Sequence, residues 1–260
     1  MNKPNIAIIY TTFLRDSLAI GTLRSILSNW NNNYLLLIGD QNNKKMDLTG
    51  CSTDKIIYYK LPYDCGLSYA RNFLIKKAAE MNIPYILMTA DSIAFTQLYD
   101  FQPIINFLES DKSIAKIGFK LDNRICWEFN LDLVPEKYFY LTISNEYSGI
   151  YKKIDLCKNF FLGKTGAFIG VPYDDNLKLF EHEDHCWRLK QAGYKTYYTE
   201  SISANYVKNE YSIEYKAMRS RMYHEFKDIL LKKYNLEAWV KYSPEVLKEI
   251  ETWKKENHCL

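Results

Sequence analysis

The sequence predicts an α/β fold in which a mostly parallel central sheet is flanked by helices and followed by a helical C-terminal extension. This expectation rests on an alternating pattern of strand and helix signals. Short runs rich in Ile, Leu and Tyr alternate along the first half of the chain with segments whose apolar residues recur at helical spacing. Repeated strand–helix units of this kind form parallel sheets with right-handed crossovers. Because no repeat or low-complexity linker interrupts the 260 residues, we expect one domain at 1–205 and a helical extension at 206–260 packed on it.

The individual elements follow from local patterns. Short apolar, β-branched runs are typical of strands buried on both faces. Strands are therefore expected at 5–12, 34–40, 55–60, 85–91, 114–120, 160–171 and 195–199. Apolar residues spaced three or four apart are typical of helices. Helices are expected from Asp16 to Trp30 and at 67–78, 104–109, 181–191, 211–234 and 245–255. The aromatic-rich segment 121–158 predicts strands and loops laid over the sheet.

The composition excludes several classes of protein. Hydrophobic residues make up 47% and charged residues 25% of the chain, an ordinary globular balance, and the net charge of +3 is too small to indicate nucleic-acid binding. The six cysteines form no C-x-x-C pair, so no zinc module is indicated, and scattered thiols fit a reducing compartment. No apolar run approaches the ~20 residues of a membrane span. We expect a cytoplasmic protein.

Polar side chains gather where the predicted strands end. Asp40 ends the second strand and Asp91 the fourth, while Thr11, Thr12 and Arg15 follow the first. Open parallel sheets bind ligands outside the carboxyl ends of their strands. These side chains can hydrogen-bond the base and ribose of a nucleotide; the alternative is that each caps a local turn. Phosphate-binding glycine loops of the G-x-G-x-x-G or P-loop type are absent.

Four stretches together resemble the inverting, sugar-nucleotide-dependent glycosyltransferases of family 2, which have the GT-A fold. They are IIYTTFLR, CGLSYARN, ILMTADSIAF and NFFLGKT…YDDNLKLFEHEDHCWRLKQAGYKTYY. The last is also similar to the catalytic region of β-1,4-N-acetylgalactosaminyltransferases. The resemblance covers residues 5–200 and implies a GT-A domain.

The resemblance also implies roles for individual residues. Donor binding falls to Thr11, Thr12, Arg15, Asp40, Gly66, Arg71, Asp91 and Ser92. Asp184, with Glu183 beside it, corresponds to the carboxylate that takes the proton from the acceptor hydroxyl. Without the resemblance, Asp184 would be interpreted as the helix-surface partner of Arg188, a pair worth ~0.3–0.5 kcal/mol. His182 and His185 lack a third ligand for zinc, so His182 is expected to orient the acceptor or the base.

The chain departs from the family at the metal site. Family members present several aspartates at the end of the fourth strand, whereas this chain has only Asp91 there. Many also place a histidine ligand after the base helix, where this chain has ISANYVKN, with no histidine. Three interpretations stay open. Asp91 holds a weakly bound Mn²⁺ or Mg²⁺; protein cations replace the metal; or the site has decayed and the protein only binds. The candidate cations are Lys208, Lys216, Arg219 and Arg221. We favour a working enzyme with a weak metal requirement or none.

Acceptor contacts and location rest on aromatic and basic residues. Trp127, in the aromatic segment, is a candidate for stacking on a sugar of the acceptor. The C-terminal lysines with Trp239 and Trp253 offer a face for peripheral contact with the inner side of a membrane. A dimer interface or plain surface are the alternatives.

These observations predict a transferase that moves a sugar from a nucleoside-diphosphate donor, UDP-sugar favoured, to a glycan hydroxyl in surface polysaccharide synthesis. A transferase that uses another activated donor, such as a CDP-linked alcohol phosphate, is the alternative among enzymes. A carbohydrate- or nucleotide-binding pseudoenzyme is the alternative outside them.

Overall fold

The computed structural model of the chain describes residues 4–30, 33–52, 54–122, 129–133, 138–208 and 213–242, with Lys248 and Thr252. Trp127, Trp253 and most of the predicted helix at 245–255 lie outside the described residues. Within the described residues, no helix has both the length and the apolar character needed to cross a lipid bilayer.

The elements follow the predicted order. The helices are α1 (Asp16–Ser28), α2 (Leu67–Glu80), α3 (Gln102–Ser110), α4 (Thr165–Gly170), α5 (Glu181–Gln191) and α6 (Ile213–Lys233). The strands are β1 (Ile6–Thr12), β2 (Tyr34–Asp40), β3 (Ile56–Lys60), β4 (Tyr85–Met88), β5 (Ile93–Ala94), β6 (Ile114–Asp122), β7 (Phe129–Leu133), β8 (Tyr138–Ile143), β9 (Tyr147–Ser148), β10 (Tyr151–Ile154), β11 (Phe161–Lys164), β12 (Lys195–Tyr206) and β13 (Ala238–Tyr242).

A large sheet runs through the molecule in the order β3-β2-β1-β4-β11-β6-β12-β10-β9. β3, β2, β1 and β4 are mutually parallel, with Thr12 opposite Asp40 and Ile9 opposite Met88. β11 lies antiparallel between β4 and β6, whereas β12 is parallel to β6. The α/β fold class expected from the sequence is therefore confirmed.

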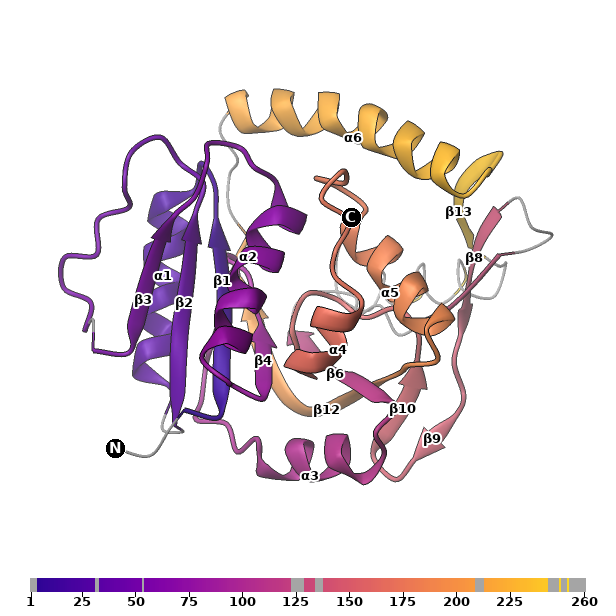
Figure 1. Cartoon of the computed structure of the whole chain (residues 1–260), viewed down its shortest axis with the longest axis horizontal. Helices are drawn as coiled ribbons and strands as arrows, with labels where there is room; N and C mark the ends of the chain where they lie inside the picture. The colour runs from indigo at the N-terminus through magenta and orange to yellow at the C-terminus, as the bar shows by residue number, and fades with distance from the viewer. Residues whose placement is uncertain are drawn as a thin grey trace.

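Two cores lie on the opposite faces of this sheet because successive strand residues point to opposite sides. Ile8 and Tyr10 of β1 pack with residues of α1 and α3. Ala7 and Ile9, between them, pack with Leu74 and its neighbours on α2. The helices thus cover both faces (Figure 1), which leaves the carboxyl edge of the parallel strands for a site.

The C-terminal segment is not purely helical. α6 runs along one edge of the molecule from the region of β1 to β13 (Figure 1), and β13 then pairs in parallel with β8 in a second, three-stranded sheet with β7. A third core joins this sheet, α5 and α6. The extension therefore shares its core with the domain.

Two local expectations needed correction. The predicted strand at 85–91 ends at Met88, so Asp91 lies in a turn beyond it. The predicted strand at 160–171 divides into β11 and the short helix α4. Thr165, the first residue of α4, donates its hydroxyl hydrogen to the carbonyl of Ile83 at 2.7 Å. This tertiary contact was not visible in the local sequence.

Candidate active site

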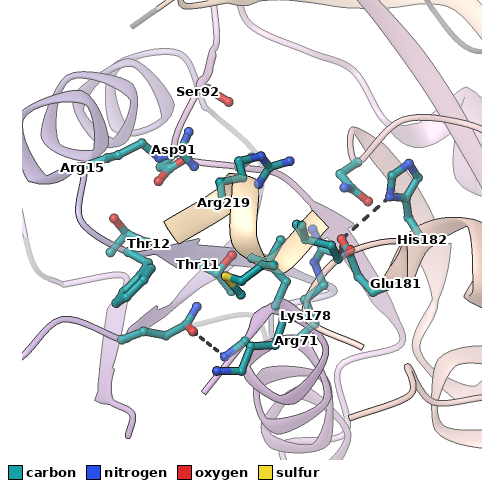
Figure 2. Close-up of a pocket in the computed structure, with 18 of the residues that line it drawn as sticks. Thr11, Thr12, Arg15, Arg71, Asp91, Ser92, Lys178, Glu181, His182 and Arg219 are labelled. Carbon is teal, nitrogen blue, oxygen red and sulfur yellow. Dashed lines mark hydrogen bonds and ion pairs between the residues drawn. The ribbon is translucent and has the colours of Figure 1, made fainter. Parts of the chain in front are cut away.

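A cavity of about 410 Å³ lies at the carboxyl ends of β1 and β4, a suitable size for a nucleotide-sized ligand. The start of α2 and the start of α5 line it, and α6 lies across it (Figure 2). Of the predicted site residues, those that line it are Thr11, Thr12, Arg15, Gly66, Arg71, Asp91, Ser92, His182, Glu183 and Arg219. Asp40, Asp184, Lys208, Lys216 and Arg221 do not, and Trp127 lies outside the described residues.

Arg15 and Asp91 form an ion pair at one side of the cavity. Leu14, with φ +56°, is in the left-handed region that non-glycine residues rarely adopt, and Arg15 follows it directly. Burial raises the pKa of the Asp91 carboxyl to about 6, although Arg15 and the Thr12 hydroxyl oppose the shift. Asp91 is thus a buried acid whose ionised form depends on Arg15.

Asp40 has a different role from the expected one. Its side chain is fully buried. It accepts hydrogen bonds from the backbone N–H groups of Asn42, at 2.8 Å, and Met46, at 3.1 Å, and from the Tyr58 hydroxyl. Asp40 therefore organises the loop after β2, and it is the next residue, Gln41, that lines the cavity.

Gly66 brings the backbone close to the cavity at the start of α2. Its φ is +88°, and a Cβ atom there would lie 2.6 Å from Cγ of Lys178. Gln41 accepts the Gly66 backbone N–H through Oε1 at 2.8 Å. Lys178 bonds to the Asp64 carboxylate at 2.8 Å and to the carbonyl of the same residue. These contacts hold the β2, β3 and α5 loops together at the rim.

Arg71 and Glu181 form a buried ion pair, with Nη1 to Oε1 at 2.8 Å. Both side chains line the cavity, at 2% and 4% exposure. Burial alone would raise the pKa of Glu181, but Arg71 and His182 outweigh it and lower the pKa to about 2. Glu181 is therefore a weak base that holds the arginine in place.

His182 and Glu183 form a second pair, with Nδ1 and Oε2 3.0 Å apart. Burial lowers the pKa of His182, but the carboxylates of Glu183 and Glu181 outweigh it and raise the pKa to about 10. The two carboxylates therefore favour the protonated form of His182 beside Glu183. Phe180, with φ +63°, precedes these residues and sets the direction in which α5 begins.

Asp184 faces away from the cavity. Its side chain is fully buried. Oδ2 accepts from Nε of Arg188 at 2.8 Å, the helix pair named above as the alternative. Oδ1 accepts from Nζ of Lys233 at 2.5 Å and from the Tyr234 hydroxyl at 2.7 Å. This placement argues against Asp184 as the base, because both oxygens are occupied and neither reaches the site.

α6 contributes one of the four predicted cations to the cavity. Arg219 lines it, together with Tyr215, Met218, Met222 and Tyr223. In Figure 2 Arg219 lies between the Arg15–Asp91 pair and the side chains of Glu181 and His182. The guanidinium of Arg15 lies over the ring of Tyr215, with Cζ 5.2 Å from the ring centre. Lys208, Lys216 and Arg221 are exposed and do not line the cavity. Lys216 and Arg221 lie on α6, and only one face of a helix can meet the cavity.

The residues around Asp91 do not fit a divalent cation well. Mg²⁺ and Mn²⁺ favour several oxygen ligands, but one Asp91 oxygen already bonds to Arg15. Among the described residues, no three His, Cys, Asp or Glu side chains gather as a metal site. Asp64, another carboxylate that lines the cavity, is paired with Lys178.

Sequence reasoning missed Gln41, Lys178 and Glu181. Glu181 lies two residues before Glu183, within the stretch EHEDHCWRL that resembles the catalytic region. Its position in the sequence could therefore have identified it as a site residue. Lys178 carries no such signal, since only the folded chain brings it to Gly66 across 111 intervening positions.

No family model matches the chain, and no curated protein matches its sequence. Among solved structures it is similar to the S. aureus protein TarS. The structure of TarS 1–349 matches with a TM-score of 0.57 at 10% identity, over 90% of this chain and 66% of that one. A longer TarS structure matches with a TM-score of 0.59 at 10% identity, over 90% and 40%.

The chain thus spans less than two thirds of either TarS structure. At this identity the likeness shows the fold alone, which is the GT-A-like α/β fold expected from the sequence. The nearer resemblance to β-1,4-N-acetylgalactosaminyltransferases stays a prediction.

Proposed function

We propose that the protein is an inverting glycosyltransferase that moves a sugar from a nucleoside-diphosphate donor, UDP-sugar favoured, to a glycan hydroxyl. The observation that carries the proposal is the cavity at the carboxyl edge of a GT-A-like sheet, which is lined both by arginines and by the His182–Glu183 pair. A glycan of a surface polysaccharide is the acceptor class suggested by the sequence resemblance.

Glu183 is the proposed general base. An inverting transfer needs one carboxylate to take the proton of the acceptor hydroxyl while the oxygen attacks the anomeric carbon. Glu183 lines the cavity, whereas Asp184 does not and Glu181 is held by Arg71. His182 lies beside the Glu183 carboxylate, with Nδ1 and Oε2 3.0 Å apart. Positioned acid–base groups of this kind contribute about 10²–10⁴-fold to rate.

The leaving diphosphate is stabilised in this proposal by protein cations. Arg15, Arg71, Lys178 and Arg219 all line the cavity. Arg15 is paired with Asp91, Arg71 with Glu181 and Lys178 with Asp64. Arg219 has no carboxylate partner among the described residues. A charge pair at 4 Å is worth about 4 kcal/mol at an effective dielectric near 20. Arg219 is therefore the cation best placed to bond to a donor phosphate.

The test is turnover. The protein is incubated with UDP-, GDP- and CDP-linked donors, with and without glycan acceptors, and release of the nucleoside diphosphate and the anomeric configuration of the product are measured. Release of UDP with inversion supports the proposal. Transfer of an alcohol phosphate from a CDP donor would replace it with the other transferase. Nucleotide binding with no turnover of any donor would indicate a binding protein.

A further inference from the structure

Asp184 ties the C-terminal end of α6 to the start of α5. Lys233 and Tyr234, the last residue of the helix and the one after it, both donate to Oδ1 of Asp184. Lys233 also bonds to Asp174 at 2.6 Å, and its pairing lowers the pKa of that carboxyl despite partial burial. Lys233 is therefore paired with two carboxylates, Asp174 before α5 and Asp184 within it.

The chain turns immediately after this contact. Asn235 is in the left-handed region, with φ +51°, and the backbone N–H of Leu236 bonds to the carbonyl of Leu231 at 2.8 Å. Capping by an αL residue is a common way to end a helix. Leu236 then enters the third core. The end of α6 is thus fixed both by the anchor and by a defined helix stop.

The other end of the same helix lies over the cavity. Tyr215, Arg219 and Tyr223 reach it from the first half of α6. Arg219 is fourteen residues from Lys233, which is about 21 Å along an α-helix at 1.5 Å per residue. Between them, Met222, Phe226 and Leu230 pack on the third core. Apolar packing keeps α6 on the core but tolerates small shifts along its axis. The ion pair of Lys233 with the buried Asp184 forms at only one position of the helix.

We propose that Asp184 is a positioning residue, which latches α6 across the donor cavity through Lys233 and Tyr234 so that Arg219 meets the donor diphosphate. The proposal rests on the proposed function for the identity of the ligand. The first turn of α5 then has two roles. Glu183 lines the cavity, and Asp184, the next residue, fixes the position of α6 across the cavity. The latch couples the position of the donor cation to the position of the base.

The test uses two single variants of the full chain, Lys233→Met and Tyr234→Phe. Each removes one donor to Asp184, and neither residue lines the cavity. Lys232→Met is the matched control, since Lys232 is exposed and adjacent, and Lys233→Arg is the conservative replacement that should restore the anchor. Backbone amide exchange is measured in the free protein, and UDP and UDP-sugar affinity is measured on the same samples.

The latch predicts a several-fold rise in amide exchange within α6 in Lys233→Met, from the released end through 215–226 and without a rise in β1 or β2. The rise is smaller in Tyr234→Phe and absent in Lys232→Met. It also predicts weaker binding of UDP and of UDP-sugar in Lys233→Met, and recovery of the exchange pattern and of donor affinity in Lys233→Arg. Unchanged exchange in α6, or a uniform rise that includes β1 and β2, would overturn it. If the wild-type protein binds no nucleotide while the exchange pattern appears, the proposed function fails and the latch stands.

Discussion

Glu183 and Asp184 are consecutive residues that face in different directions: Glu183 lines the cavity and pairs with His182, and Asp184 is buried against Lys233 and Tyr234. Consecutive residues on an α-helix are about 100° apart around its axis, since a turn takes 3.6 residues. One side chain can therefore serve the reaction while the next holds the structure around it.

Glu183→Gln and Asp184→Asn should separate these roles. Glu183→Gln removes the proposed base but keeps its shape, so we expect kcat to fall by about 10²–10⁴-fold with nucleotide affinity retained. Asp184→Asn weakens the anchor of α6, so its main effect should be on donor affinity and on stability. Steady-state kinetics and nucleotide titration measure both. Loss of kcat with intact donor binding in Asp184→Asn alone would return the base to Asp184.

Arg219→Ala should weaken donor binding by about tenfold or more, because a hydrogen bond to a charged group contributes about 1.5–3 kcal/mol. Arg221→Ala is the matched control, as it removes the same side chain from the same helix outside the cavity. Calorimetric titration with UDP compares them. Equal affinities in the two variants would show that α6 supplies no phosphate contact.

Gly66→Ala should lower the free energy of unfolding by about 1 kcal/mol or more. The residue would keep a φ of +88° that alanine adopts only with strain, and its Cβ would displace Lys178. Gly166→Ala is the control, because a Cβ there meets nothing within 4 Å. Urea unfolding monitors both variants. Equal stability of Gly66→Ala and wild type would mean that the loop relaxes without strain.

The stability of the protein should depend on His182 in a particular pH range. The folded pKa is about 10, against about 6.5 in an unfolded chain, so folding favours the protonated form. The stabilisation is complete below pH 6.5 and is lost as the pH rises toward 10. The stability difference between wild type and His182→Gln should therefore shrink between pH 6.5 and 9.5.

Urea unfolding at several pH values measures this difference, and His224→Gln, on the exposed face of α6, serves as the control. Parallel pH profiles for wild type and His182→Gln would show that Glu181 and Glu183 do not hold a charged imidazole.

The sequence predicted most of the sheet because strand and helix periods are local. The patterns around β1, β2 and β4 also placed Thr12 and Asp91 at the correct edge. The same argument, that a polar residue at the end of a strand lines the site, did not hold for Asp40, which also ends a strand but does not line the cavity. Its carboxylate turned inward because Asn42, Met46 and Tyr58 supply donors there, and one of these comes from another strand.

The site could be predicted only where a residue's direction follows from its own element. Arg219 and Arg221 have the same chemistry and differ in which face of α6 they occupy, a choice that the packing of the third core decides. The choice between Glu183 and Asp184 as base was of the same kind, since it depends on where α6 lies. Lys178 and Gly66 meet only through the fold.

Thermal shift with UDP, GDP, CMP and CDP, each in Mn²⁺ and in EDTA, tests the central claim most directly. Wild type is compared with Arg219→Ala. The account predicts stabilisation by one nucleoside diphosphate, UDP in the favoured case, that persists in EDTA and is reduced in Arg219→Ala. Stabilisation that appears only with Mn²⁺ and is indifferent to Arg219 would contradict a donor site built from protein cations.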